Sequence, residues 1–227
     1  MDSRVVLRYS IREALGLVGM AVALFWSAGK VLWWPAWGAL AVMAAWTAAT
    51  AVIIYRYNPE LLRERLGPRQ GARRWDAAIV SSLGLVTLAR YIVAGLDERY
   101  GWSGDFPLAV QITALLLSAL GYAVFTWATY SNAYFSQIVR IQSERGHTVV
   151  SGGPYRWVRH PAYAGAILYE LAVPILLASW WSLAISVLSA SLLVLRTALE
   201  DRFLQRELNA YSEYAGRVRH RLLPGVW

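Results

Sequence analysis

The 227-residue sequence contains no cysteine, and Lys30 is its only lysine. The absence of cysteine excludes a disulfide framework, a thiolate metal site and a cysteine nucleophile, and it leaves the redox compartment undetermined. Charged residues are also scarce, at 16%, whereas 57% of the residues are hydrophobic and 12 are tryptophans. Such a composition is unlike that of an ordinary soluble domain and is typical of a protein that crosses a membrane several times.

Six apolar segments predict an all-α, polytopic transmembrane helix bundle of about six spans in one compact domain. They lie at Ala14–Trp34, Ala36–Tyr55, Ala77–Leu96, Leu108–Tyr130, Ala162–Ser179 and Trp181–Leu195. The second and fourth carry no formal charge and are long enough to cross a bilayer core of about 30 Å. The sixth is short, so we expect its helix to continue beyond the lipid into residues 196–211, which contain neither glycine nor proline.

The net charge of +8 comes almost wholly from arginine. It indicates either nucleic acid or an anionic lipid surface as a partner, and the hydropathy favours membrane lipid and no nucleic acid. Of the 22 basic residues, 19 lie before the first span, between the second and third, between the fourth and fifth, or after the sixth. The positive-inside rule therefore predicts that both termini and residues 131–161 are cytoplasmic. No cleavage site follows the N-terminal apolar run, so we expect that span to be retained.

Two features of the spans and one loop have more than one interpretation. Arg90 and Glu170 are charged residues inside predicted spans, where a charge is costly. Pairing with Arg90 is favoured for Glu170, and the alternatives are that it faces a lipid-tail tunnel or is protonated. Pro174 is expected to kink the fifth helix, and the kink could open a lateral slot for a lipid chain. The arginine-rich loop 56–76 is interpreted as a topology anchor, with binding flat on lipid headgroups as the alternative.

Residues 146–165 combine two of the three histidines with turn-forming glycines and two prolines, directly before an apolar helix. This mixture suits a small-molecule pocket better than a plain hydrophobic scaffold. Pro161 is well suited to the first turn of the fifth helix, whose unpaired N–H groups favour an anion or the carboxylate of an amino-acid-like cofactor. The plainer alternative is that Arg159 and His160 only mark the membrane interface. Tyr163 follows His160 by three residues, so the two are neighbours on a helix.

Arg196 and Glu200 lie four residues apart at the cytoplasmic end of the sixth helix. Residues with this spacing share one helix face, so both side chains are predicted to lie beside the 146–165 stretch. An ordinary surface ion pair is the alternative. Their position on the same membrane rim as residues 146–165 favours a shared site.

Four ordered blocks of residues resemble the superfamily of isoprenylcysteine carboxyl methyltransferases and phospholipid N-methyltransferases. They are Gly146-His147-Thr148-Val149-Val150, Gly153-Pro154-Tyr155, Arg159-His160-Pro161-Ala162-Tyr163-Ala164-Gly165 and Glu200-Asp201. The tail from Tyr211 to Gly225 also resembles the C-terminal end of that family. The resemblance covers about residues 131–227 and implies two parts: four N-terminal spans in residues 1–130, and a methyltransferase core with a cofactor-binding loop, a helical hairpin and a cytosolic C-terminal helix.

The resemblance implies a cytosolic S-adenosylmethionine pocket formed by the C-terminal half of the chain. On this sequence its residues are Gln142, the strand-like His147, Thr148, Val149 and Val150, and Tyr155, His160, Tyr163, Gly165 and Glu200. It also implies that Arg196 is the catalytic residue that binds the acceptor group of the substrate. Methyl transfer from a sulfonium requires the donor and the acceptor to be aligned in a site without water, and it requires no metal. We therefore expect no metal site.

The acceptor is predicted to be lipophilic and to come from the bilayer, as a prenylated cysteine, a prenyl acid or a lipid. A carboxylate acceptor is already ionised and needs no base, and a guanidinium orients its two oxygens. An amine acceptor needs a base, which Arg196 does not supply. O-methylation of an isoprenylcysteine-like carboxylate is therefore favoured over phospholipid N-methylation. The remaining alternatives are a membrane reductase, although no dinucleotide loop is recognisable, and a transporter, although no paired broken helices are visible.

Overall fold

The computed structural model describes residues 3–61 and 73–227, and in this part of the chain it contains helices and no strand. The α-helices are α1 (Ser3–Ala28), α2 (Trp34–Tyr57), α4 (Arg74–Tyr100), α5 (Leu108–Ser131), α6 (Pro161–Leu176), α7 (Trp180–Glu207) and α8 (Tyr211–Arg217), and two short 3₁₀ helices are η1 (Ser143–Arg145) and η2 (Gly153–Arg156). Five of these, α1, α2, α4, α5 and α7, are long and apolar enough to cross a membrane, whereas α6 is apolar but shorter. The predicted all-α transmembrane bundle is confirmed.

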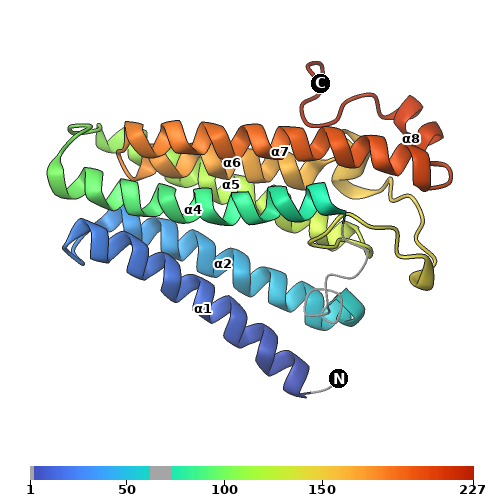
Figure 1. The fold of residues 1–227 in the computed structure, drawn as a ribbon, viewed down its shortest axis with the longest axis horizontal. Helices are drawn as coiled ribbons and strands as arrows, with labels where there is room; N and C mark the ends of the chain where they lie inside the picture. The colour runs from blue at the N-terminus through green and yellow to red at the C-terminus, as the bar shows by residue number, and fades with distance from the viewer. Residues whose placement is uncertain (1–2, 62–72) are drawn as a thin grey trace.

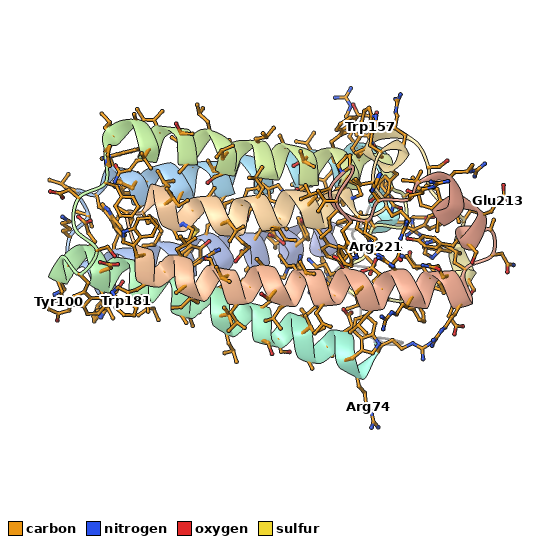
Figure 2. The ribbon with its side chains drawn as sticks, turned by 90° about the horizontal axis from the view of Figure 1, so that it is seen from above. Arg74, Tyr100, Trp157, Trp181, Glu213 and Arg221 are labelled. Atoms are coloured by element: carbon orange, nitrogen blue, oxygen red, sulfur yellow. The ribbon has the colours of Figure 1, made fainter. Side chains whose placement is uncertain are left out.

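Helices α4, α5, α6 and α7 run side by side, and α1 and α2 lie along one side of them (Figure 1). Helix α1 packs on α4, α2 packs on α5, and α6 packs between α5 and α7. The loop 132–160, the end of α7 and α8 all gather at one end of the bundle. Four aromatic or charged side chains mark its two ends in Figure 2: Tyr100 and Trp181 lie at one, and Trp157 and Glu213 lie at the other.

Two boundaries differ from the sequence prediction. The first span was expected to continue to Trp34, but α1 ends at Ala28 because Gly29 adopts a φ of 68°, a left-handed conformation that ends a helix. The prediction that the sixth helix extends beyond its apolar part is confirmed, since α7 continues to Glu207. It stops before Tyr211 because Ala210 has a positive φ of 62°, and α8 begins there in a new direction. The extension of α7 places Arg196 and Glu200 at the loop-rich end.

Close backbone packing joins α5 to α6. A Cβ atom on Gly121 would come within 2.6 Å of the carbonyl oxygen of Gly165, and one on Gly165 would overlap the carbonyl oxygen of Gly121. Small residues allow such an approach between helices in a membrane bundle. Gly165, a predicted cofactor-binding residue, therefore serves first to dock the short helix α6 on α5.

The predicted pairing of Arg90 with Glu170 is confirmed. Arg90 Nη1 lies 2.6 Å from Glu170 Oε2, and the arginine side chain is fully buried between α4, α6 and α7. Its guanidinium also lies 4.6 Å from the ring centroid of Tyr91. The pair neutralises two charges that would otherwise be costly inside a bundle. Pro174 lies inside α6, two residues before its last residue, Leu176. The kink and the lateral slot stay predictions.

A buried carboxylate organises the end of the bundle remote from the loop 132–160. Asp97 on α4 accepts hydrogen bonds from the backbone N–H of Ser103 at 2.8 Å and from the hydroxyl of Ser179 at 2.5 Å. The Ser179 hydroxyl in turn caps α7 by accepting from the Ser182 N–H. Asp97 therefore links α4, the loop after it and the start of α7 at this end of the bundle. Residues 62–72 of the predicted topology anchor 56–76 lie outside the described ranges.

Candidate functional site

A cavity of about 420 Å³ opens at the loop-rich end of the bundle, between α6, α7 and the loop 132–160. Its volume lies in the range of small-molecule sites, about 300–1,000 Å³. The predicted site residues that line it are His147, Thr148, Val149, Val150, Tyr155, His160, Tyr163, Arg196 and Glu200. The structure thus brings together nine residues that lie up to 53 positions apart in the sequence.

Glu200 and Tyr163 form one wall of this cavity. The Tyr163 hydroxyl donates a hydrogen bond of 2.5 Å to Glu200 Oε2, and the Tyr163 ring stacks on the His160 ring with centroids 5.9 Å apart. In the described part of the chain, the Glu200 carboxylate has no arginine, lysine or histidine within ion-pairing distance. The cavity therefore presents a carboxylate that is oriented by a neutral hydroxyl and forms no direct ion pair with a described residue, although it lies close enough to Arg196 for the two charges to interact.

Arg196 lies one helical turn away and is held by other groups. Its Nε donates a hydrogen bond of 2.8 Å to Asp76 Oδ1, and its Nη2 donates one of 2.9 Å to the backbone carbonyl of Gln137. The Asp76 side chain is fully buried and also accepts from the Val139 N–H at 2.8 Å. Its carboxylate thus fixes both the guanidinium and the cavity-lining segment around Val139. Among the described residues, Nη1 of Arg196 has no hydrogen-bond partner.

Asp201 is buried behind the cavity and joins the loop before α6 to the C-terminal tail. It receives two hydrogen bonds from Arg159, at 2.7 and 2.9 Å, and one of 2.8 Å from Arg221 Nε. Its Oδ1 also lies 3.3 Å from His160 Nε2 and accepts from the Tyr211 hydroxyl at 3.1 Å. The two parallel hydrogen bonds between Arg159 and Asp201 join charged groups, so they hold the two side chains in a fixed orientation. Asp201 therefore positions the wall that contains His160 and does not itself line the cavity.

The C-terminal tail is paired with the same loop through its backbone. The N–H groups of Arg159 and His160 donate to the carbonyls of His220 and Arg221 at 3.0 and 2.9 Å. The Trp227 carbonyl accepts from the Arg221 N–H at 2.8 Å, which folds the chain end back on itself. These contacts bring the tail beside residues 159–160 at the start of α6.

The segment 147–150 forms the opposite wall and has no regular secondary structure, so the strand-like conformation expected from the sequence is not a sheet strand. The His147 ring stacks on Tyr134, with centroids 4.5 Å apart, and its Nδ1 accepts the N–H of Gln142 at 3.3 Å. Burial lowers the pKa of His147 below its usual value, and the positive charges of Arg145 and Arg140 lower it further. The ring is therefore held neutral, with Nδ1 as the acceptor.

Tyr155 lies at the inner corner of the cavity. Its hydroxyl accepts a hydrogen bond from the Asn132 side-chain amide at 3.2 Å, and its carbonyl accepts one from the Tyr214 hydroxyl at 2.7 Å. Burial raises the pKa of Tyr155 above its usual value. The side chain is thus a neutral aromatic surface at physiological pH.

Two predicted cofactor-binding residues do not line the cavity. Gly165 lies in the α5–α6 contact, and Gln142 is fully buried, where its amide donates to the Tyr134 carbonyl at 2.7 Å and its oxygen accepts from Arg145. Both support residues that do reach the cavity.

Sequence reasoning missed Asp76, Tyr211 and the segment 137–140. Asp76 is the only one of these that offered a signal, because it is an acidic residue in the first turn of a helix that follows two arginines. That position indicates a favourable interaction between the Asp76 carboxylate and the helix dipole. It does not indicate that Asp76 binds Arg196, 120 residues later in the chain. The segment 137–140 has no regular secondary structure that a periodicity could have revealed.

The comparison with known proteins is consistent with this site. Residues 109–206 match the model of the isoprenylcysteine carboxyl methyltransferase (ICMT) family. The chain is therefore related to the ICMT family. The match begins within α5, earlier than residue 131 where the sequence resemblance was placed, and it ends before the tail.

Curated relatives of this ICMT-like chain carry the same family name. It is 26% identical over 141 residues to protein-S-isoprenylcysteine O-methyltransferase B of Arabidopsis thaliana, covering 59% of this chain and 68% of the plant protein. It is 31% identical over 120 residues to the protein-S-isoprenylcysteine O-methyltransferase of Saccharomyces cerevisiae, covering 50% of each chain. It thus spans half the length of the yeast protein.

The fold extends this similarity beyond the matched residues. The structure is similar to that of the eukaryotic intramembrane Ras methyltransferase ICMT, with a TM-score of 0.55 and 16% sequence identity. The superposition covers 94% of this chain and 75% of the other. The spans α1, α2 and α4, which lie before the matched residues, are therefore part of a shared membrane fold.

Proposed function

We propose that this ICMT-like chain is an integral membrane methyltransferase that transfers a methyl group from S-adenosylmethionine to the carboxylate of a lipophilic, isoprenylcysteine-like acceptor. The observation that supports it most is the Glu200 carboxylate, which lines the cavity without a cationic partner in the described part of the chain. A carboxylate in that state fits a ligand with a positive charge. The names of the related proteins, isoprenylcysteine O-methyltransferases, support the same reaction.

The cavity residues fit S-adenosylmethionine by their chemistry. Glu200 would bind a cationic or hydroxyl part of the cofactor, and the aromatic faces of Tyr155 and Tyr163 suit the adenine or the sulfonium. Backbone groups of residues 148–150 suit the edge of the purine. Gln142 and Gly165 would act from outside the cavity, by holding the neighbouring elements in place.

The methyl group is supplied by a positively charged sulfur, so the acceptor oxygen forms a bond to carbon while the carbon–sulfur bond breaks. The chain has to orient the acceptor and exclude water, and it needs no base for a carboxylate that is already ionised. Arg196 suits this task because Asp76 and Gln137 hold Nε and Nη2, which leaves Nη1 for the acceptor. Its fixed position removes the entropy of ordering a long side chain during binding.

The deep end of the cavity suits a hydrocarbon chain. It is lined by apolar residues of α4, α5, α6 and α7: Val80, Leu83, Phe125, Ala166 and Leu193. Trp46 of α2 lines this end and also a second, largely apolar groove of about 810 Å³ between α2 and α5. The hydrocarbon chain of an acceptor would therefore find apolar surface on both sides of Trp46.

We place the cavity at the cytoplasmic face of the membrane. The arginine-rich ends of α1, α2, α4 and α7 lie at the same end of the bundle as the loop 132–160. The positive-inside rule orients that end toward the cytoplasm, where S-adenosylmethionine would be available.

Calorimetric titration of the purified protein with S-adenosylmethionine and with NADPH tests the cofactor class. We expect saturable binding of S-adenosylmethionine and none of NADPH. Binding of NADPH alone would instead favour the reductase alternative.

The affinity for S-adenosylmethionine is expected to fall only once the pH drops below the lowered pKa of folded His147, which is less than the usual histidine value of about 6.5. The pKa of His147 is lowered in the folded protein, so the unfolded chain binds the proton more readily. The stabilisation from neutral His147 is therefore fully present above the unfolded pKa and is lost as the pH falls toward the lowered one. Protonation removes the acceptor for the Gln142 N–H and loosens the 147–150 wall.

Calorimetry between pH 5 and 8 measures this effect. His147→Asn, whose side-chain oxygen replaces Nδ1 as an acceptor, should flatten the acidic part of the profile. His220→Gln is the matched control, because the His220 ring accepts from the Gly225 N–H and does not line the cavity. An unchanged profile for His147→Asn would contradict this role.

A further inference from the structure

The spacing of Arg196 and Glu200 predicts an ion pair between them, and in the structure each side chain is instead bonded to another group. Residues four positions apart on a helix have Cβ atoms about 5–6 Å from each other, which an arginine side chain easily spans. Among the described residues, however, the ion-pair partner of Arg196 is Asp76 at 2.8 Å, and its second hydrogen bond goes to the Gln137 carbonyl. Both contacts lie on other segments of the chain.

Tyr163 stands between the two side chains. Its ring centroid lies 5.4 Å from the Arg196 guanidinium carbon, and its hydroxyl donates to Glu200 at 2.5 Å. The tyrosine thus contacts the arginine with its face and the glutamate with its hydroxyl.

Removal of Asp76 would leave a nearly buried guanidinium without its counter-charge. Arg196 is only 9% exposed, and an uncompensated charge at such a site is strongly unfavourable. The lowest-cost response is to turn toward the next carboxylate on the same helix face, which is Glu200. That rearrangement would neutralise Glu200 and obstruct the cavity.

We propose that Asp76 is a positioning residue that holds Arg196 away from Glu200, so that Glu200 stays available for the cationic cofactor. The fully buried Asp76 carboxylate, its 2.8 Å bond to Arg196 Nε and the unpaired state of Glu200 support this role. Asp76 acts through Arg196 and does not contact the ligand, since it does not line the cavity. The inference rests on the proposed binding of S-adenosylmethionine.

The test is a double-mutant cycle with S-adenosylmethionine affinity measured by calorimetry. Asp76→Ala should weaken binding about tenfold, because Arg196 then competes with the cofactor for Glu200. Asp76→Ala combined with Arg196→Ala should restore the affinity of the Arg196→Ala protein, because the competing arginine is gone. A purely structural role for Asp76 predicts no such rescue. Asp76→Asn, which keeps the side-chain volume, provides the same test if the alanine variant does not fold.

Asp97→Ala is the matched control. Asp97 is a buried carboxylate at the other end of the same helix, so its loss should lower thermal stability without changing cofactor affinity, and Arg196→Ala should not reverse that loss. Normal affinity in a folded Asp76→Ala protein, or weakened affinity that Arg196→Ala fails to restore, would overturn the proposal. A wild-type protein that does not bind S-adenosylmethionine would instead refute the proposed function itself.

Discussion

Arg196→Ala is expected to reduce methyl transfer by at least about 100-fold while S-adenosylmethionine affinity stays essentially unchanged. Alignment of the reacting atoms contributes this much or more to such reactions, and Arg196 is the cavity-lining cation whose Nη1 has no partner among the described residues. Removal of the guanidinium leaves the acceptor carboxylate without an orienting group. The cofactor keeps Glu200 and Tyr163, which are hydrogen-bonded to each other independently of Arg196.

The rate of labelled methyl transfer, together with calorimetry, separates these two effects. Arg202→Ala is the control, because Arg202 is exposed on the same helix and lines no part of the cavity. An equal loss of cofactor affinity in Arg196→Ala would contradict the assignment of Arg196 to the acceptor.

Glu200→Gln is expected to weaken S-adenosylmethionine binding roughly 10- to 30-fold, in the range for loss of one member of a partly buried charge pair. The substitution keeps the length of the side chain and an oxygen that accepts from Tyr163, so the shape of the cavity should be preserved. What it removes is the negative charge that we assign to the cationic cofactor. The turnover rate at saturating cofactor should fall much less than the affinity.

Calorimetry and cofactor KM measure this difference. Glu207→Gln is the matched control, since Glu207 is exposed at the end of α7, away from the cavity. Unchanged affinity in Glu200→Gln would contradict the assignment of the Glu200 charge to cofactor binding.

Features that depend on local patterns could be predicted from the sequence. Apolar runs of sufficient length located the spans, and the absence of glycine and proline in residues 196–207 predicted the extension of α7. The cost of isolated charges in a membrane predicted the Arg90–Glu170 pair. The family resemblance predicted nine of the residues that line the cavity.

Features that depend on distant contacts could not be predicted. Spacing alone pairs Arg196 with Glu200, and only the folded structure shows that Asp76, 120 residues earlier in the chain, binds Arg196. From the sequence, Gly165 could allow close approach of either a ligand or another helix. The structure shows close approach of α5, because Gly165 packs directly on Gly121. Asp201 follows Glu200 directly in the sequence, yet it points to the opposite side, toward Arg159 and Arg221.

Methyl transfer to a prenylated cysteine carboxylate tests the proposed function most directly. The purified protein would be incubated in lipid vesicles with S-adenosylmethionine labelled in its methyl group and an S-farnesylcysteine acceptor. We expect label to enter the acceptor as a methyl ester that mild base releases, and Arg196→Ala to prevent this. Label that enters only base-stable lipid amines, or no transfer by a wild-type protein that binds the cofactor, would contradict carboxyl methylation of a prenylated acceptor.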